Sequence, residues 1–241
     1  MKAERNILMN DVISEKILKK LPDIAKAMQN AYEDLLPLFT SQELETRNYL
    51  PFLKWDCINT SLVGLPGFEI KKSRRGSWSF LLIFEPESQL VITLIKKGKL
   101  ESIQKSKNKS SSQYINELTG LNKELHGDGS PYSLWGNESD DNNFLSAIEK
   151  ECLSFTGMKD LADARHLFIV FDDFKNRLNH LSAIVVDSNF YQVGDAIDMM
   201  GMLATEMLLP LETVSTHTEE ASVTLSPYAL KLRELNNAAN N

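Results

Sequence analysis

The chain has 241 residues, of which 42% are hydrophobic and 24% are charged, and its formal net charge at pH 7 is −7. This composition excludes a collagen-like, low-complexity or wholly disordered protein. A chain of this length buries enough apolar surface to fold without a metal ion or a disulfide bond.

The cysteines and the N-terminal segment indicate the compartment. Cys57 and Cys152 stand far apart, and neither belongs to a CxxC motif or lies near a histidine at ligand spacing. We therefore predict no metal site and no resident cofactor. Residues 1–20 lack the apolar core of a secretory signal, and no window approaches roughly 18 uninterrupted apolar residues. These features predict no membrane contact and a cytoplasmic location with reduced thiols.

Two helices are predicted in the first quarter of the chain. Apolar residues recur every three or four positions over residues 9–36, and Pro22 is expected to kink or split this helix. A second amphipathic helix is predicted from Tyr49 to Leu62, ending at the turn residues of 64–67.

Three strand-like runs come next, rich in β-branched and aromatic residues: Phe68–Lys72, Trp78–Phe84 and Leu90–Ile95. Their connections are short, which favours antiparallel pairing, because parallel strands need long crossovers.

The remaining elements alternate in type. We predict helices over 99–106, 114–125 and 144–155, with a polar linker at 105–112 and a long loop at 126–142, then strands over 167–171 and 181–186, and a buried Met-rich helix over 199–211. The order of elements predicts an α+β fold with a mainly antiparallel sheet and N-terminal and flanking helices. We expect a single domain over 1–210, with a sub-boundary allowed in the loop 126–142, and a polar, at best partly ordered tail over 211–241.

Charge is unevenly distributed along the chain. Residues 71–109 contain ten Lys or Arg and three Glu, a balance of +7, whereas residues 128–241 contain 18 acids and seven bases, a balance of −11. A polyanion partner, a contact between the two halves, or a solvated surface each explains this asymmetry. The candidate binding residues are Lys71, Lys72, Arg74, Arg75, Trp78, Lys96 and Lys97. Trp78 can stack a base, although its alternation with Phe80 and Leu82 favours the core.

One catalytic hypothesis stands beside this binding hypothesis. Asp56, followed by Glu69 and Lys71 in an E-x-K pattern, resembles the signature of PD-(D/E)xK nucleases. In such a site two carboxylates hold Mg²⁺, which polarises the phosphate, and the lysine stabilises the developing charge. However, Asp56 falls on a predicted helix, where the nuclease pattern requires the end of a strand. The favoured interpretation of Glu69 and Lys71 is a same-face ion pair on an exposed strand. Mg²⁺ is expected only under this alternative.

Other polar groups carry weaker signals. The acids of the C-terminal half match no EF-hand order, so turn and capping roles explain them: Asp172, Asp173, Asp187, Asp195 and Asp198. His166 and His180 flank the last two predicted strands, where a structural role is typical. The chain lacks the GxSxG, P-loop, GxGxxG and HExxH motifs.

A resemblance concerns residues 50–125. The run W-D-C-I-N-T at 55–60, R-G-S-W at 75–78, the basic segment after Lys96, and Tyr114 followed by Leu118, Leu121 and Asn122 are similar to a bacterial family of unknown function. The resemblance implies a small cytoplasmic accessory protein of mobile-element or phage-conflict systems, and it implies no mechanism. It draws attention to Trp55, Asp56, Asn59, Arg75 and Trp78.

Three functions are therefore expected as alternatives. The first is a non-catalytic regulatory or neutralising protein that binds a macromolecular partner, such as a toxin–antitoxin or phage-defence component. The second is a Mg²⁺-dependent nuclease using Asp56, Glu69 and Lys71. The third is a nucleic-acid-binding module that reads phosphates through residues 71–109. A homodimer is also allowed, through the Met-rich run 199–209.

Overall fold

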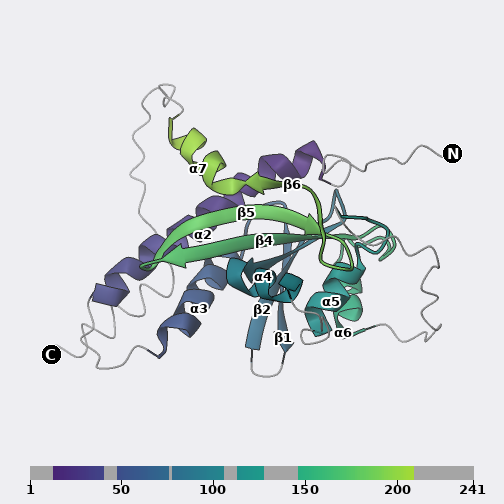
Figure 1. The fold of residues 1–241 in the computed structure, drawn as a ribbon, viewed down its shortest axis with the longest axis horizontal. Helices are drawn as coiled ribbons and strands as arrows, with labels where there is room; N and C mark the ends of the chain where they lie inside the picture. The colour runs from purple at the N-terminus through teal and green to yellow at the C-terminus, as the bar shows by residue number, and fades with distance from the viewer. Residues whose placement is uncertain (1–12, 41–47, 76–77, 106–112, 128–145, 209–241) are drawn as a thin grey trace. The chain divides into compact units, whose positions relative to one another are not determined.

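The computed structural model describes residues 13–40, 48–75, 78–105, 113–127 and 146–208. They belong to one compact unit that ends at Leu208. Its centre is a six-stranded sheet whose strands lie in chain order (Figure 1): β1 (Glu69–Arg75), β2 (Trp78–Glu85), β3 (Leu90–Lys96), β4 (Arg165–Phe174), β5 (Arg177–Val186) and β6 (Gln192–Asp198). The predicted tail and most of the predicted loop 126–142 lie outside the described residues.

Neighbouring strands run antiparallel, except that β3 and β4 are parallel. The parallel pair requires a crossover, which contains α4 (Lys97–Lys105), α5 (Gln113–Gly120) and α6 (Ala147–Leu153). Ser146 and Glu149 form a capping box at the start of α6. The predicted α+β class with a mainly antiparallel sheet is confirmed.

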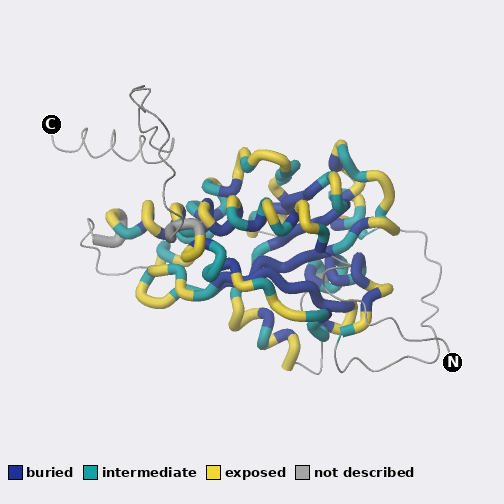
Figure 2. The backbone as a smooth tube through the Cα atoms, turned by 90° about the horizontal axis from the view of Figure 1, so that it is seen from above, coloured by how far each residue is buried: buried dark blue, intermediate teal, exposed yellow. Residues whose placement is uncertain are grey.

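Helices cover both faces of the sheet (Figure 1). On one face, side chains of β2 to β6 pack against α2 (Glu15–Thr40), α3 (Leu50–Leu62) and α7 (Met199–Leu208). On the other face, the alternate side chains pack against α4, α5 and α6. The central strands are therefore buried along most of their length, as Figure 2 shows. None of the described helices is long and apolar enough to cross a membrane.

Helix α2 contains two prolines. It continues through Pro22 and Pro37, so the split that was one of the two expected effects of Pro22 does not occur. A proline inside a helix removes one backbone hydrogen bond, but most helical stability in proteins comes from tertiary packing. Leu21, Ile24 and Ala25, which surround Pro22, are completely buried, and this packing keeps the helix continuous.

The C-terminal strands are longer and more numerous than predicted. Strands β4 and β5 meet at a two-residue turn in which Lys175 and Asn176 both have positive φ angles, of 49° and 62°. Such a turn matches the twist of paired strands. Strand β6 was not predicted, because only Val193 and Ile197 give it apolar alternation and Gly194 interrupts it. The predicted Met-rich helix is α7.

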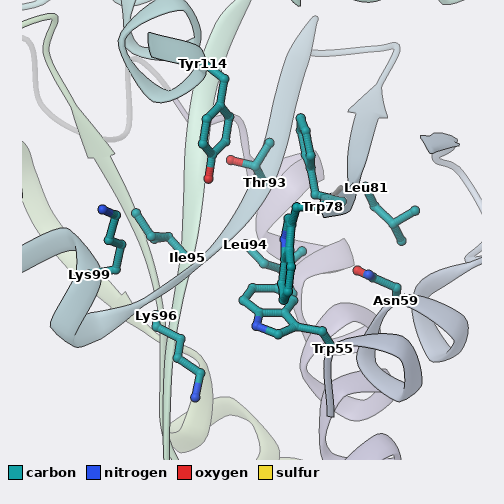
Figure 3. A pocket seen from close by; sticks show the side chains of 11 residues that line it. Trp55, Asn59, Trp78, Leu81, Thr93, Leu94, Ile95, Lys96, Lys99 and Tyr114 are labelled. Carbon is teal, nitrogen blue, oxygen red and sulfur yellow. The ribbon is translucent and has the colours of Figure 1, made fainter. Parts of the chain in front are cut away.

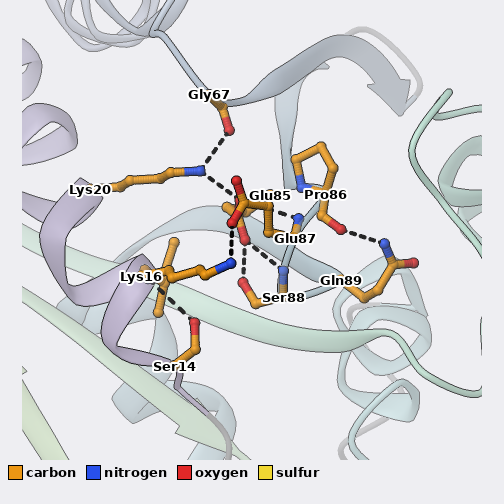
Figure 4. Close-up of polar contacts among 10 residues, drawn as sticks. Ser14, Lys16, Lys20, Gly67, Glu85, Pro86, Glu87, Ser88 and Gln89 are labelled. Atoms are coloured by element: carbon orange, nitrogen blue, oxygen red, sulfur yellow. Dashed lines mark hydrogen bonds and ion pairs between the residues drawn. The ribbon is translucent and has the colours of Figure 1, made fainter.

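The turn between β2 and β3 is anchored to α2 by a buried carboxylate (Figure 4). The Glu85 side chain is completely buried and accepts hydrogen bonds from Lys20 Nζ at 2.6 Å and from the Ser88 backbone N–H at 2.8 Å. Burial by itself would raise the pKa of Glu85, but the hydrogen bonds from Lys20 and Ser88 lower it below its usual value. An exposed pair between Lys16 and Glu87 lies beside it. These contacts fix the end at which β2 and β3 remain paired.

Candidate binding pocket

Strands β2 and β3 pair at one end and separate at the other. Strand β1 pairs with residues 78–84 of β2, and β4 pairs with β3 along the whole length of β3. Between β2 and β3, however, pairing is confined to 83–85 against 90–92. The segments 78–82 and 93–96 therefore face each other without forming a ladder, and this split opens the sheet.

A pocket of about 260 Å³ lies at the split (Figure 3). Helix α3 contributes to its lining from one face of the sheet, and α4 and α5 contribute from the other face. The lining residues are Trp55, Asn59, Trp78, Phe80, Leu81, Thr93, Leu94, Ile95, Lys96, Lys99 and Tyr114.

Aromatic rings form much of the wall. The Trp55 ring meets Trp78 edge to face with 5.8 Å between ring centroids, and it meets Phe171 in the same way at 5.2 Å. Phe52 extends this group on the outside, 5.8 Å from Trp78, and is 60% exposed. The rings of Phe80 and Tyr114 also meet, with 5.2 Å between their centroids. The rings thus present apolar surface and π faces to the pocket.

Trp78 is not a core residue, contrary to the interpretation that its alternation favoured. Its side chain is 36% exposed. The physical reason is the split: Trp78 lies where β2 has left β3, so no continuous sheet face covers its ring. Its contacts with Phe52 and Trp55 place it at the wall of the pocket instead.

Lysines supply the charge at this site. Lys96 and Lys99 line the pocket, and Lys99 is exposed. Lys96 Nζ lies 3.1 Å from Asp173 Oδ1, while Lys54 Nζ lies 2.6 Å from Asp173 Oδ2. Burial by itself would raise the pKa of Asp173, but its hydrogen bonds with Lys54 and Lys96 lower it below its usual value. The Asp173 carboxylate thus holds Lys96 beside the pocket. Among the described residues, none that lines the pocket carries a carboxylate.

A buried polar network lies behind the pocket. Thr93, which lines the pocket, has its Oγ1 2.8 Å from Nε2 of His166, a completely buried residue. Asn122 accepts a hydrogen bond from the His166 backbone N–H and donates to the backbone oxygens of His166 and Val186, each at 2.8 Å. The regular pairing of β4 with β5 begins at Phe168 and Ile184, two residues from His166 and Val186. The Asn122 amide therefore bridges the two strands at the end where they are not yet paired.

The three residues of the nuclease hypothesis are not brought together. Glu69 accepts hydrogen bonds from the backbone N–H groups of Thr156 and Gly157, both at 2.8 Å, on the side of the sheet covered by α6. Lys71 donates to Ser154 on the same side. Asp56 is exposed on α3, which packs on the opposite face.

Glu69 and Lys71 thus hold the segment that follows α6 against β1, which is a structural role. Within the described residues, no three His, Cys, Asp or Glu side chains lie close enough to hold a metal ion. The geometry gives the nuclease alternative no support.

The candidate binding residues do not all lie at the pocket. Trp78 and Lys96 line the pocket, and Lys97 is exposed at the start of α4 beside Lys96. Lys72 and Arg74 are exposed on β1. Lys71 is committed to Ser154, and the Arg75 side chain lies outside the described residues.

Several site residues come from the resemblance rather than from the charge pattern. Trp55 and Asn59 stand in one motif and Trp78 and Tyr114 in two others, yet all four line the pocket. Thr93 was not named by any sequence pattern, Phe80 entered only through its alternation with Trp78, and Lys99 entered only as part of the basic segment 71–109. A threonine or phenylalanine inside a predicted strand carries no local signal for a pocket.

These features define an α+β protein with helices on both faces of a six-stranded sheet and a pocket where two central strands separate. The chain belongs to a family of unknown function, DUF5986, whose family model matches residues 9–240. No curated protein matches the chain, and no solved structure matches it.

Proposed function

We propose that this chain is a non-catalytic protein that binds single-stranded nucleic acid. One base enters the pocket between β2 and β3, and neighbouring phosphates contact the lysines at its edge. The observation that carries the proposal is the meeting of aromatic walls and lysines at one pocket: Trp55, Trp78, Phe80 and Tyr114 with Lys96 and Lys99. Stacking on aromatic rings combined with contacts from basic residues to the backbone is the usual means of binding single strands.

The size of the pocket supports a single planar group. Its volume of about 260 Å³ lies just below the roughly 300–1,000 Å³ of sites that enclose drug-sized ligands. The rings of Trp55 and Trp78, which meet edge to face, both line the pocket, and an indole face is a surface on which such a group can stack. A base attached to a flexible backbone meets both conditions, because the sugar and phosphates stay outside.

The charge pattern extends the site beyond the pocket. Lys97 is exposed next to Lys96 on α4, and Lys72 and Arg74 are exposed on β1, the neighbour of β2. These side chains offer further phosphate contacts for a strand of several nucleotides. Binding of this kind is the means by which the protein would exert a regulatory or neutralising effect, and a place in toxin–antitoxin or phage-defence systems stays a prediction.

The test measures binding of a fluorescent oligonucleotide of about a dozen thymidines or uridines by anisotropy over a range of salt concentrations. Affinity is expected to fall steeply with salt, and K96Q/K99Q is expected to weaken binding and reduce the slope by about 1.4, because each phosphate contact contributes about 0.7 for single strands. W78A is expected to weaken binding roughly five- to a hundredfold with an unchanged slope, because one stacked base is lost.

The matched control is K123Q/K159Q, which makes the same change in net charge at two exposed lysines outside the pocket lining. It is expected to retain binding close to that of the wild type. Absence of binding to both DNA and RNA at low salt would refute the proposal, and capture of a protein partner by such a preparation would then favour the partner alternative.

A further inference from the structure

We infer that His166 orients the Thr93 hydroxyl so that it donates a hydrogen bond into the pocket, and that the pocket therefore selects a base presenting a carbonyl acceptor, such as thymine or uracil. This inference rests on the proposed function and adds a specificity to it. Thr93 is the residue that contacts the ligand, and His166 is a positioning residue.

The position of the His166 ring is tightly fixed. Its backbone N–H and carbonyl oxygen are both bound by the Asn122 side chain at 2.8 Å. Its ring meets Phe168 edge to face, with 4.3 Å between ring centroids. Its Nε2 lies 2.8 Å from Thr93 Oγ1. The ring therefore has one hydrogen-bond partner among the described residues, the Thr93 hydroxyl at Nε2.

The protonation of His166 follows from its surroundings. Complete burial lowers its pKa to about 3, so the ring is neutral at physiological pH and carries one N–H. Nδ1 is buried and has no hydrogen-bond partner among the described residues. A proton on Nδ1 would be a buried donor without an acceptor, and such donors are rarer in proteins than unpaired acceptors. The proton is therefore placed on Nε2, which donates to Thr93 Oγ1.

This arrangement decides the role of the Thr93 hydroxyl. Its oxygen accepts from His166, so its own proton is free to point elsewhere. Thr93 is β-branched and only 3% exposed on a strand, so its side chain has little freedom to reorient. Figure 3 shows the Thr93 oxygen pointing toward the hydroxyl of Tyr114, another residue of the pocket lining. The hydroxyl proton is thus presented to whatever occupies the pocket.

A hydrogen-bond donor at this point makes the pocket selective. A base carbonyl satisfies the donor, whereas a ring of the same shape without a good acceptor leaves it unpaired. Loss of one such neutral hydrogen bond is expected to weaken binding roughly two- to tenfold. The side chains of Leu94 and Ile95 beside Thr93 are apolar, and the other neutral polar side chains of the lining, Asn59 and Tyr114, belong to α3 and α5.

The first measurement reads the His166 tautomer directly, without any ligand. ¹⁵N chemical shifts of the histidine ring nitrogens in the whole protein are expected to show a protonated Nε2 and a bare Nδ1 for His166, unchanged between pH 5 and pH 8. A proton on Nδ1, with the hydroxyl of Thr93 donating to Nε2, would overturn the inference.

The second measurement compares two oligonucleotides, one of thymidines and one in which each thymine is replaced by difluorotoluene, a ring of the same shape that accepts hydrogen bonds poorly. The wild type is expected to prefer the thymidine strand, T93S to keep this preference, and T93V to lose it. Circular dichroism and a thermal midpoint establish that T93V is folded. Equal binding of the two strands by the wild type overturns the inference and leaves the proposed function intact, whereas binding of neither strand overturns the proposed function itself.

Discussion

Replacing Asp173 with asparagine tests how the edge of the pocket is held together. Asp173 lies near the end of β4, and its side chain is 9% exposed. Its carboxylate accepts hydrogen bonds from Lys54 of α3 at 2.6 Å and from Lys96 of β3 at 3.1 Å, and the Tyr32 hydroxyl of α2 lies 3.4 Å away. A single charge therefore joins three other elements around one corner of the sheet.

The magnitude follows from the exposure of the partners. In D173N one amide oxygen still accepts a hydrogen bond, but both lysines lose their counter-charge. The Lys54 side chain is only 14% exposed, so water replaces little of its lost contact with the Asp173 carboxylate, whereas Lys96 is 42% exposed and regains water. Breaking a buried pair costs about 3–5 kcal/mol, and the surviving hydrogen bond offsets part of this. We expect D173N to lower the free energy of unfolding by about 3 kcal/mol and the thermal midpoint by roughly 6–12 °C.

The pH dependence supplies a second check on the same reasoning. Because the pKa of Asp173 is lowered in the folded state, its carboxylate stabilises the fold above its unfolded pKa of about 3.9, and this stabilisation is lost as the pH falls through the folded pKa. The difference in unfolding free energy between wild type and D173N is therefore expected to be constant from pH 7 to about pH 5 and to shrink by pH 3.

Urea unfolding followed by tryptophan fluorescence at each pH gives the difference. The control is D56N, at an exposed carboxylate on α3, which is expected to stay within about 0.5 kcal/mol of the wild type. A D173N effect below about 1 kcal/mol at pH 7, or one that is undiminished at pH 3, would refute the reasoning.

Three further predictions concern the fold. E85Q removes the charge that Lys20 binds, and it is expected to lower the free energy of unfolding by about 2–4 kcal/mol in urea titrations at pH 7. An unchanged midpoint would show that the turn between β2 and β3 does not depend on the pair of Lys20 and Glu85. A Cβ added at Gly127 would lie 2.5 Å from the backbone just before β6, so G127A is expected to be destabilised by about 1–3 kcal/mol, while G98A, in open space on α4, is not destabilised. Burial raises the pKa of the Cys152 thiol to about 12, so its alkylation by iodoacetamide at pH 8 is expected to be slow in the native protein and fast in urea, and equal rates would contradict its burial.

Much of the secondary structure could be predicted because its signals are local. The three-to-four-residue period of α2 and the β-branched runs of β2 and β3 identify these elements without any tertiary information. Short connections between β1, β2 and β3 likewise predict their antiparallel order. Packing overrides local preference at two places: Pro22 does not split α2, since its neighbours are buried, and β6, which was not predicted, forms along β5 despite a weak alternation pattern.

The candidate site could be predicted only in pieces. The basic segment and Trp78 were identified from composition, and the resemblance drew attention to Trp55 and Asn59. Their meeting at one pocket depends on α3 and β2 lying side by side, which no residue spacing reveals. His166 was assigned a structural role, and its contact with Thr93 joins residues 73 positions apart.

The sequence by itself determined the types and order of the elements other than β6, the α+β class and the concentration of positive charge in residues 71–109. These are properties of local pattern and composition. Only the tertiary structure decided that β2 and β3 pair over 83–85 and 90–92 alone. It also decided that aromatic rings from three elements line the resulting gap, and that Glu69 and Lys71 bind the segment after α6. The physical reason is that strand pairing and helix packing are set by contacts between residues distant in the chain, so a pocket formed where one pairing stops has no signature in any single stretch of sequence.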